Sequence, residues 1–191
     1  MKNKGLLYFC IVVFNIFLFN ILFPISYDDS DIVLSVPKNV KNNDVILLNL
    51  DNDDIYSLAK SEVLKNKKIV NDVYFCTNEY RNELSLNSLV YDDDLSYAAT
   101  IRAIEIAVND KFEHVRPNGL SYSSILKELN ISSTSNGENI AFGYNSSSDV
   151  CLAWKNSNDH YFNIVYEKYN RIGIGFFKYN GISYWVQIFS N

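Results

Sequence analysis

The chain contains only two histidines among its 191 residues, His114 and His160, and the acid Glu138 lies between them in the sequence. Glu138 belongs to the segment GENIAFG, where its neighbours are glycines, an asparagine and apolar residues. A carboxylate in this setting is costly to bury unless a donor or a cation pairs with it. We therefore predict that Glu138 accepts a hydrogen bond from one of the two imidazoles. The pKa of that imidazole would rise above the ordinary value of about 6.5 unless burial or a metal opposes the shift.

The same three residues suggest two kinds of chemistry. Two neutral imidazoles and a carboxylate can hold zinc with one position left open for water. Without a metal, they form a set of hydrogen-bonding groups for a polar ligand. Ser157, three residues before His160, also offers a nucleophile with His160 as its base. We rank that mechanism last, because neighbours at i and i+3 are common by chance and the sequence shows no oxyanion-hole motif.

Several polar residues near these positions have a structural interpretation as well. Asn139 follows Glu138 directly and would tie neighbouring loops together by hydrogen bonds. Arg116 would form a surface ion pair with Glu113 or Asp159, which contributes little to stability. Trp154 is expected in the core.

The elements that must position these residues can be predicted from periodicity and capping signals. Helices are expected over residues 71–89, 92–110, 121–130, 146–157 and 158–167, an extended segment over 138–144, and strands over 171–179 and 183–190. Asn180-Gly181 between the last two segments is a strong hairpin signal. Helices followed by antiparallel strands indicate an α+β layered domain.

Six motifs in this order resemble the CAP superfamily: the cysteine-rich secretory, antigen 5 and pathogenesis-related 1 proteins. They are NEYR, LVYDDDLSYAATIRA, FEHVRPNG, GENIAFG, W-x-x-S-x-x-H-x-x-N-I and IGIG…YWVQIF, and the match is to the bacterial SCP-like branch. The resemblance implies an α-β-α sandwich with one open cleft. His114, Glu138 and His160 match the two histidines and one acid of that cleft, while Ser157 stands where many eukaryotic members have a second acid.

The resemblance favours a non-catalytic binding module. Its ligand-binding residues would be His114, Glu138, His160, Ser157 and Asn139. The ligand would be a small molecule, a weakly bound divalent metal or a partner in the cell envelope. The alternative is a zinc-dependent hydrolase at the same residues, with His114 and His160 as metal ligands. No cofactor is required on the first interpretation; on the second, zinc would be bound weakly.

Composition and the N-terminal sequence indicate where the protein works. The formal net charge is −5 and the pI is about 5.0, which argues against a nucleic-acid partner. Residues 1–26 combine two lysines with a long apolar run, the pattern of a signal peptide or an N-terminal membrane anchor. We expect a secreted or membrane-anchored protein that meets the membrane only through this segment. Residues 27–70 form an acidic and polar spacer, and residues 71–191 form the CAP domain.

Three cysteines have different expected environments. Cys10 lies in the predicted export segment. Cys76 and Cys151 lie in the predicted domain, where an exported protein would meet oxidising conditions. Two alternatives remain for this pair: one disulfide, or two buried apolar thiols.

Overall fold

The computed structural model describes residues 50–191. The predicted export segment and residues 27–49 of the predicted spacer lie outside the described residues. The helices are α2 (Asn52–Lys65), α3 (Lys67–Glu83), α4 (Asp93–Asn109), α5 (Ser124–Glu128), α6 (Ser147–Asn156) and α7 (Asn158–Val165). The strands are β1 (Val90–Tyr91), β2 (Asn136–Phe142), β3 (Arg171–Tyr179) and β4 (Ile182–Ser190). None of these helices is long and apolar enough to cross a membrane.

The described strands form a single sheet in the order β1-β3-β4-β2. The predicted hairpin is present: β3 and β4, which lie before and after Asn180-Gly181, pair antiparallel. Strand β2 pairs antiparallel with β4, with Glu138 opposite Ile188 and Asn139 opposite Gln187. The short strand β1 adds a parallel pair with β3, which the sequence analysis did not anticipate.

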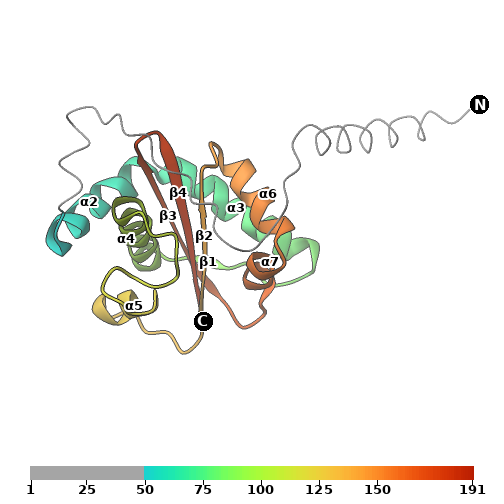
Figure 1. Cartoon of the computed structure of the whole chain (residues 1–191). Coiled ribbons are helices and arrows are strands. Elements are labelled where there is room, and N and C mark those ends of the chain that lie inside the picture. The colour runs from blue at the N-terminus through green and yellow to red at the C-terminus, as the bar shows by residue number, and fades with distance from the viewer. Residues whose placement is uncertain (1–49) are drawn as a thin grey trace, which may run out of the picture. The chain divides into compact units, whose positions relative to one another are not determined.

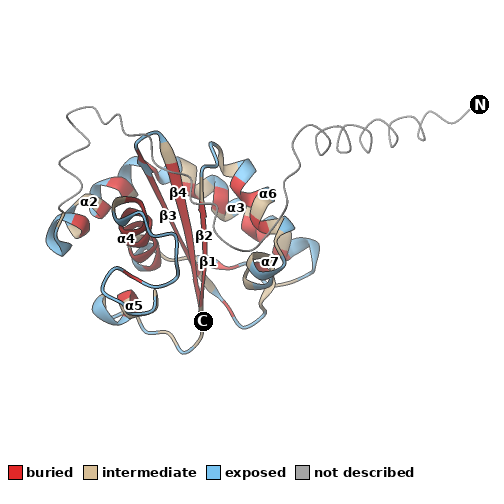
Figure 2. Ribbon diagram, viewed as in Figure 1, coloured by how far each residue is buried: buried red, intermediate tan, exposed pale blue. Residues whose placement is uncertain are grey.

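Two layers of helices cover the sheet, as Figure 1 shows. Apolar side chains of α2, α4 and α5 form one core with one face of the sheet, and those of α3, α6 and α7 form a second core with the other face. Strands β3 and β4 are buried along nearly their whole length (Figure 2). A sheet covered on both faces needs apolar residues on both sides of its strands, which explains the nearly unbroken apolar runs in the sequence. The predicted α-β-α sandwich is confirmed.

Helix α4 packs unusually close to the sheet and carries part of the functional site. Its N-cap is Asp92, whose Oδ1 accepts a hydrogen bond of 2.9 Å from the Leu95 amide. A Cβ atom at Gly173 or Gly175 of β3 would overlap the backbone of α4. The two glycines of RIGIGFF therefore permit the close approach, and α4 is buried on almost every side from Leu95 to Ala107.

Helix α2 packs onto this domain, although the sequence analysis assigned its residues to a spacer. Asp51 caps it, with Oδ1 accepting a hydrogen bond of 2.9 Å from the Asp54 amide. Ile55 and Ala59, one helical turn apart, are buried in the same core as α4. In the sequence, the spacing of these two apolar residues was only a weak sign of a packed helix, because their neighbours are acidic. The structure shows that they pack in the same core as α4. The described part of the predicted spacer therefore belongs to the packed structure.

Cys76 of α3 and Cys151 of α6 form a disulfide, with their Cα atoms 6.6 Å apart. Of the two alternatives left by the sequence, the structure has the bridge. It links two helices of the same layer across 75 positions of the sequence.

Candidate functional site

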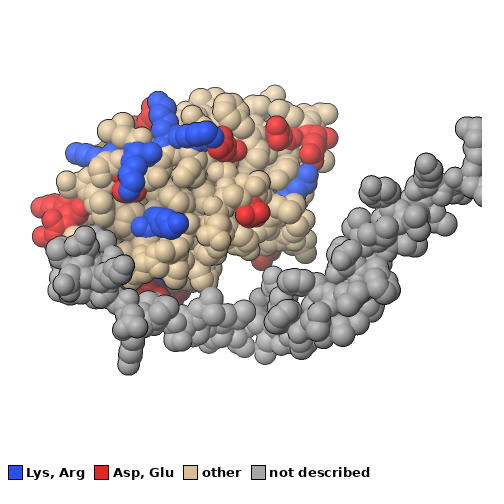
Figure 3. Space-filling model, turned by 90° about the horizontal axis from the view of Figure 1, so that it is seen from above, with Lys and Arg blue, Asp and Glu red and all other residues tan. Residues whose placement is uncertain are grey.

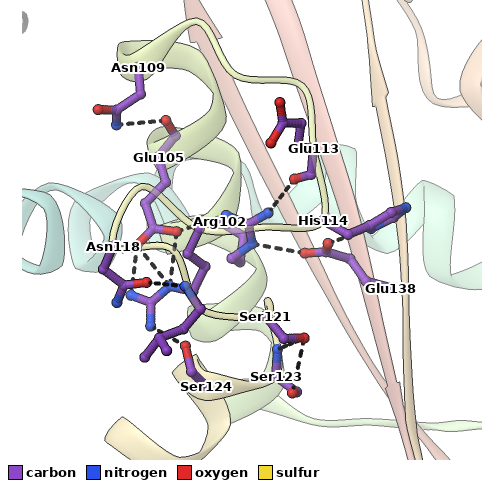
Figure 4. Close-up of polar contacts among 12 residues, drawn as sticks. Arg102, Glu105, Asn109, Glu113, His114, Asn118, Ser121, Ser123, Ser124 and Glu138 are labelled. Carbon is purple, nitrogen blue, oxygen red and sulfur yellow. Dashed lines mark hydrogen bonds and ion pairs between the residues drawn. The ribbon is translucent and has the colours of Figure 1, made fainter.

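Glu138 lies on β2 with its side chain fully buried on the face of the sheet that α4 covers. Its Oε1 atom is 2.8 Å from Nδ1 of His114, in the loop between α4 and α5. Its Oε2 atom accepts a hydrogen bond of 3.0 Å from Nε of Arg102, on α4. The predicted contact between Glu138 and a histidine is therefore present, and a buried arginine that the sequence analysis did not select occupies the other oxygen (Figure 4).

Arg102 begins a chain of buried ion pairs that leads away from His114. Its Nη1 atom donates to Glu105 Oε2 at 2.8 Å. Arg116 then donates to Glu105 from Nε and Nη2, the shorter bond being 2.7 Å, and from Nη1 to Glu128 Oε1 at 2.7 Å. The hydroxyl of Tyr56 on α2 donates to the other oxygen of Glu128, also at 2.7 Å. Side chains of α2, α4, α5 and β2 are thus joined in one network.

The prediction of a surface ion pair for Arg116 is wrong. Its side chain is only 2% exposed, and its partners are Glu105 and Glu128 rather than Glu113 or Asp159. Burial alone would lower the pKa of Arg116, but the hydrogen bonds to Glu105 and Glu128 outweigh burial and raise the pKa. The pKa of Glu128 is lowered, chiefly by its hydrogen bond to Arg116. Breaking a buried pair of this kind leaves an uncompensated charge and costs several kcal/mol, roughly 3–5.

A sequence signal for this network existed in α4. The segment TIRAIEIAV is apolar except for Thr100, Arg102 and Glu105, and a helix that is apolar on every side is expected to be buried. Charged residues in the middle of such a helix must find partners, since they are almost never buried alone. The spacing of Arg102 and Glu105 by one turn indicated one of these partners. The others come from distant segments.

Gly137 and Asn139, on either side of Glu138, connect β2 to the opposite layer. A Cβ atom at Gly137 would lie 2.6 Å from the Tyr169 hydroxyl and 2.8 Å from Asn163 Oδ1, so a larger residue would have to displace these side chains. Asn139 Nδ2 donates to the His160 carbonyl and to Gln187 Oε1, each at 3.0 Å. Asn139 is fully buried. It therefore holds α7 against the sheet, as its structural interpretation predicted, and it is not accessible to a ligand.

His160 lies on α7 next to β2 and is half-buried. Its pKa is lowered, first by burial and then by the charge of the nearby His114, while Asp159 opposes the shift. The lowered pKa leaves the His160 ring neutral near neutral pH. The contact with Glu138, which was expected to raise the pKa of a histidine, is made by His114. Asn139, next to Glu138, donates to the His160 carbonyl, so both histidines lie beside the segment that carries Glu138.

Two further groups shape the surroundings of the histidines. Tyr122 packs edge-to-face with the His114 ring, and its hydroxyl donates to Asn136 Oδ1 at 2.8 Å. Burial and the charge of Glu138 raise the pKa of Tyr122, so the phenol stays protonated. On the other side, Arg81 is buried beneath α7 and donates to the carbonyls of Ile164 and Tyr166 at its C-terminal end. A cation at this end of a helix is favourable.

Ser157 lies at the junction between α6 and α7, where the backbone is extended. Its amide donates to the Trp154 carbonyl and its carbonyl accepts from the Tyr161 amide. Trp154 itself is buried, as predicted. Ser157 therefore changes the direction of the chain between the two helices. It is not among the residues whose side chains contact the Glu138 carboxylate, which are Arg102 and His114.

The donor set fits zinc poorly. The Glu138 side chain is fully buried and each of its oxygens is hydrogen-bonded, to His114 and to Arg102, so it is not exposed to an ion that approaches from the solvent. His114 and His160 then remain as two ligands, fewer than the three protein ligands of catalytic zinc sites. Within residues 50–191, no group of three or more His, Cys, Asp and Glu side chains is arranged to hold a metal.

Two well-formed cavities of the described structure lie elsewhere. One, of about 480 Å³, is bordered by α3, the start of α6 and the aromatic residues Phe176 and Trp185. The other, also about 480 Å³, lies between the segment 143–145 and α6. Neither is lined by His114 or His160. The His114 side chain is 54% exposed, so it can be reached from the solvent.

The sequence model of the CAP family, described as the Cysteine-rich secretory protein family, matches residues 74–189. The chain belongs to the CAP family. Its predicted family membership is thus confirmed, and the CAP match contains all the predicted site residues as well as Arg102, Glu105 and Glu128. Tyr56 and helix α2 lie before the matched segment.

Relatives of this CAP protein include YkwD of Bacillus subtilis (strain 168), which is 33% identical over 113 residues. That match covers 59% of this chain and 43% of YkwD, so the chain spans about two fifths of the length of this curated relative. Among solved structures, an outer surface protein of Borrelia burgdorferi aligns with a TM-score of 0.62 at 26% identity. The alignment covers 66% of this chain and 94% of the Borrelia protein.

An extracellular protein of Bacillus anthracis that contains an SCP domain aligns with a TM-score of 0.59. Its identity is 20%, and the alignment covers 75% of this chain and 44% of that protein. At this identity the likeness shows the shared fold alone. Together with the family match, these relatives place the chain among CAP-domain proteins of the bacterial SCP type.

Proposed function

We propose that this protein is an exported CAP-domain binding module, whose site around His114 and His160 holds a polar ligand of the cell envelope. Export is supported by the N-terminal sequence and by the Cys76–Cys151 disulfide, because such bridges persist in oxidising surroundings. The relatives described as outer surface and extracellular proteins agree with this location. The domain would lie outside the cytoplasmic membrane, either released or held by residues 1–26.

The observation that carries this proposal is the burial of Glu138 with both oxygens occupied. A carboxylate in that position orients His114, and its burial keeps it from direct contact with a ligand at the surface. What remains accessible is the outer part of the His114 ring, whose side chain is 54% exposed, and the half-buried ring of His160. These two imidazoles are therefore the groups of the site that can form hydrogen bonds with a ligand.

The chemistry of the surface narrows the ligand class. The neutral His160 ring can both donate and accept a hydrogen bond, which suits hydroxyl and amide groups. The ring of Tyr122 packs edge-to-face against the His114 ring and adds apolar surface beside that histidine. We therefore propose a neutral polar ligand with some apolar surface, such as an envelope sugar or a peptide.

Charge does not favour a polyanion as the partner. The chain is acidic overall, and on the face shown in Figure 3 acidic side chains lie among the basic ones. A nucleic-acid site would require a basic patch or stripe. We accordingly propose no nucleic-acid partner, and membrane contact only through the N-terminal segment.

The test is sedimentation of purified residues 50–191 with isolated envelopes of the producing cells. This range contains both cores and every residue of the site, and a cooperative thermal transition is required before use. Replacing both histidines by alanine removes two hydrogen bonds of about 1 kcal/mol each, so affinity should fall roughly 30-fold. Lys155→Ala on α6 is the control and should bind normally. Equal retention of the double variant and the unmodified domain would refute the proposal.

Zinc is tested in the same experiment. Addition of EDTA should leave envelope binding unchanged, and isothermal titration with Zn²⁺ should show weak binding that disappears in the double variant. Binding that requires zinc, together with zinc-dependent hydrolysis of envelope material, would support the hydrolase alternative.

A further inference from the structure

We propose that Arg102 is a positioning residue that determines which ring nitrogen of His114 faces the solvent. The inference deepens the proposed function, on which it rests for its biological meaning, because the accessible nitrogen decides whether the site accepts or donates a hydrogen bond at that point. It concerns a residue of α4 that does not itself reach the surface: the Arg102 side chain is 1% exposed.

Arg102 holds the His114 segment at two points. Its Nη2 atom donates to the carbonyl of Glu113 at 2.9 Å, which fixes the backbone immediately before His114. Its Nε atom donates to Oε2 of Glu138 at 3.0 Å, which fixes the carboxylate that contacts the ring. The guanidinium group is planar and its donors have fixed directions, so both contacts are set by one rigid group.

The remaining side of the guanidinium group is also fixed. Nη1 donates to Glu105 Oε2 at 2.8 Å, and Glu105 is held in turn by Arg116. Both Glu105 and Arg116 are at most 5% exposed, so water does not compete for these bonds. Arg102 therefore has no alternative orientation available without breaking an ion pair in a dry environment.

The consequence for His114 follows from donor and acceptor rules. The Glu138 carboxylate only accepts, so the His114 nitrogen at 2.8 Å must be the donor, and that nitrogen is Nδ1. In the neutral ring, Nε2 then carries the lone pair. Figure 4 shows the far side of the ring pointing away from Glu138 and Arg102. When the ring is neutral, the site thus presents a hydrogen-bond acceptor to a ligand.

Glu138→Gln gives a sharp test, because an amide side chain accepts at one end and donates at the other. Arg102 can only donate, so it should hold the amide oxygen on its own side and direct the NH₂ group toward His114. His114 must then accept through Nδ1, and its proton should move to Nε2. ¹⁵N NMR of the histidine rings at alkaline pH distinguishes the two neutral tautomers without any ligand. We expect Nδ1–H in the unmodified domain and Nε2–H in Glu138→Gln.

The role of Arg102 is isolated by repeating the measurement in Arg102→Met/Glu138→Gln. This double variant removes one positive and one negative charge together, so it leaves no unpaired buried charge and should fold. The introduced amide is then free to turn, and we expect a mixture of the two His114 tautomers.

Arg81→Met is the matched control, since Arg81 is equally buried but lies on the other face of the sheet beneath α7. It should reduce stability and shift the signals of His160 while the His114 tautomer stays unchanged. The proposal is overturned if Glu138→Gln keeps the Nδ1–H form, or if it shows Nε2–H equally with and without Arg102. Because the signals are read without ligand, these outcomes are independent of whether the envelope-binding experiment succeeds.

Discussion

Reduction of the Cys76–Cys151 disulfide should destabilise the domain by an amount that follows from its place in the chain. The bridge closes a loop of 75 positions. In the chain-entropy description, a loop of this length constrains the unfolded state by about 4 kcal/mol. For a domain of roughly 140 residues, each kcal/mol shifts the melting temperature by about 3 °C, so reduction should lower Tm by about 12 °C. The sulfur atoms stay in place, so the packing of the folded state changes little.

The assay is thermal unfolding of residues 50–191 with and without a phosphine reductant, followed by circular dichroism. This range excludes Cys10, so Cys76 and Cys151 are the only thiols present. The Cys76→Ala/Cys151→Ala variant is the control and should melt at one temperature whether or not the reductant is present. If the unmodified domain keeps its Tm within about 2 °C after reduction is verified by mass, the constraint on the unfolded chain has been overestimated and the bridge is not an important source of stability.

Three further predictions concern the site and the domain boundary. His160 should titrate below the ordinary imidazole value of about 6.5 by NMR, because burial and His114 lower its pKa. Its folded pKa is depressed, so the unfolded state binds the proton more readily, and stability should fall as pH drops below about 6.5; His160→Gln should flatten this slope, and an equally steep slope would contradict it. Gly137→Ala should cost about 1–3 kcal/mol in chemical denaturation, because the new methyl group meets the Tyr169 hydroxyl at 2.6 Å. The cost should be smaller in a Tyr169→Phe background, and equal costs would exclude this clash as the cause. A fragment of residues 72–191 should unfold at lower urea than residues 50–191, because it lacks α2 and the first turn of α3 with the buried Val70; identical midpoints would show that these residues contribute nothing.

The site could be predicted in part. His114 stands out because the chain has only two histidines. Glu138 stands out because it lies in an otherwise apolar segment. Their hydrogen bond followed from the cost of burying a carboxylate alone. The second partner, Arg102, could be suspected from its position in an apolar helix, but nothing in the local sequence pairs it with a residue 36 positions away. The sequence could not tell the two histidines apart: His114 contacts Glu138, while burial lowers the pKa of His160.

The boundary of the packed structure shows a different limit of sequence reasoning. Helix α2 has few apolar residues, and acidic neighbours at its start resemble a linker. Its place is decided by two contacts with distant residues: Tyr56 donates to Glu128, and the Tyr97 hydroxyl donates to the Tyr56 carbonyl at 3.0 Å. A short apolar face becomes stable only when a complementary surface exists to cover it.

Local signals along the chain were enough to establish the α+β class, the hairpin at Asn180-Gly181 and the family, because these depend on periodicity, turn chemistry and the order of motifs. Only the tertiary structure determines which charged residues form ion pairs and which of them are buried. Arg116, for example, is an interior residue that pairs with Glu105 and Glu128. Desolvation and ion pairing depend on distances between segments far apart in sequence, and those distances are fixed only when both cores close around the sheet.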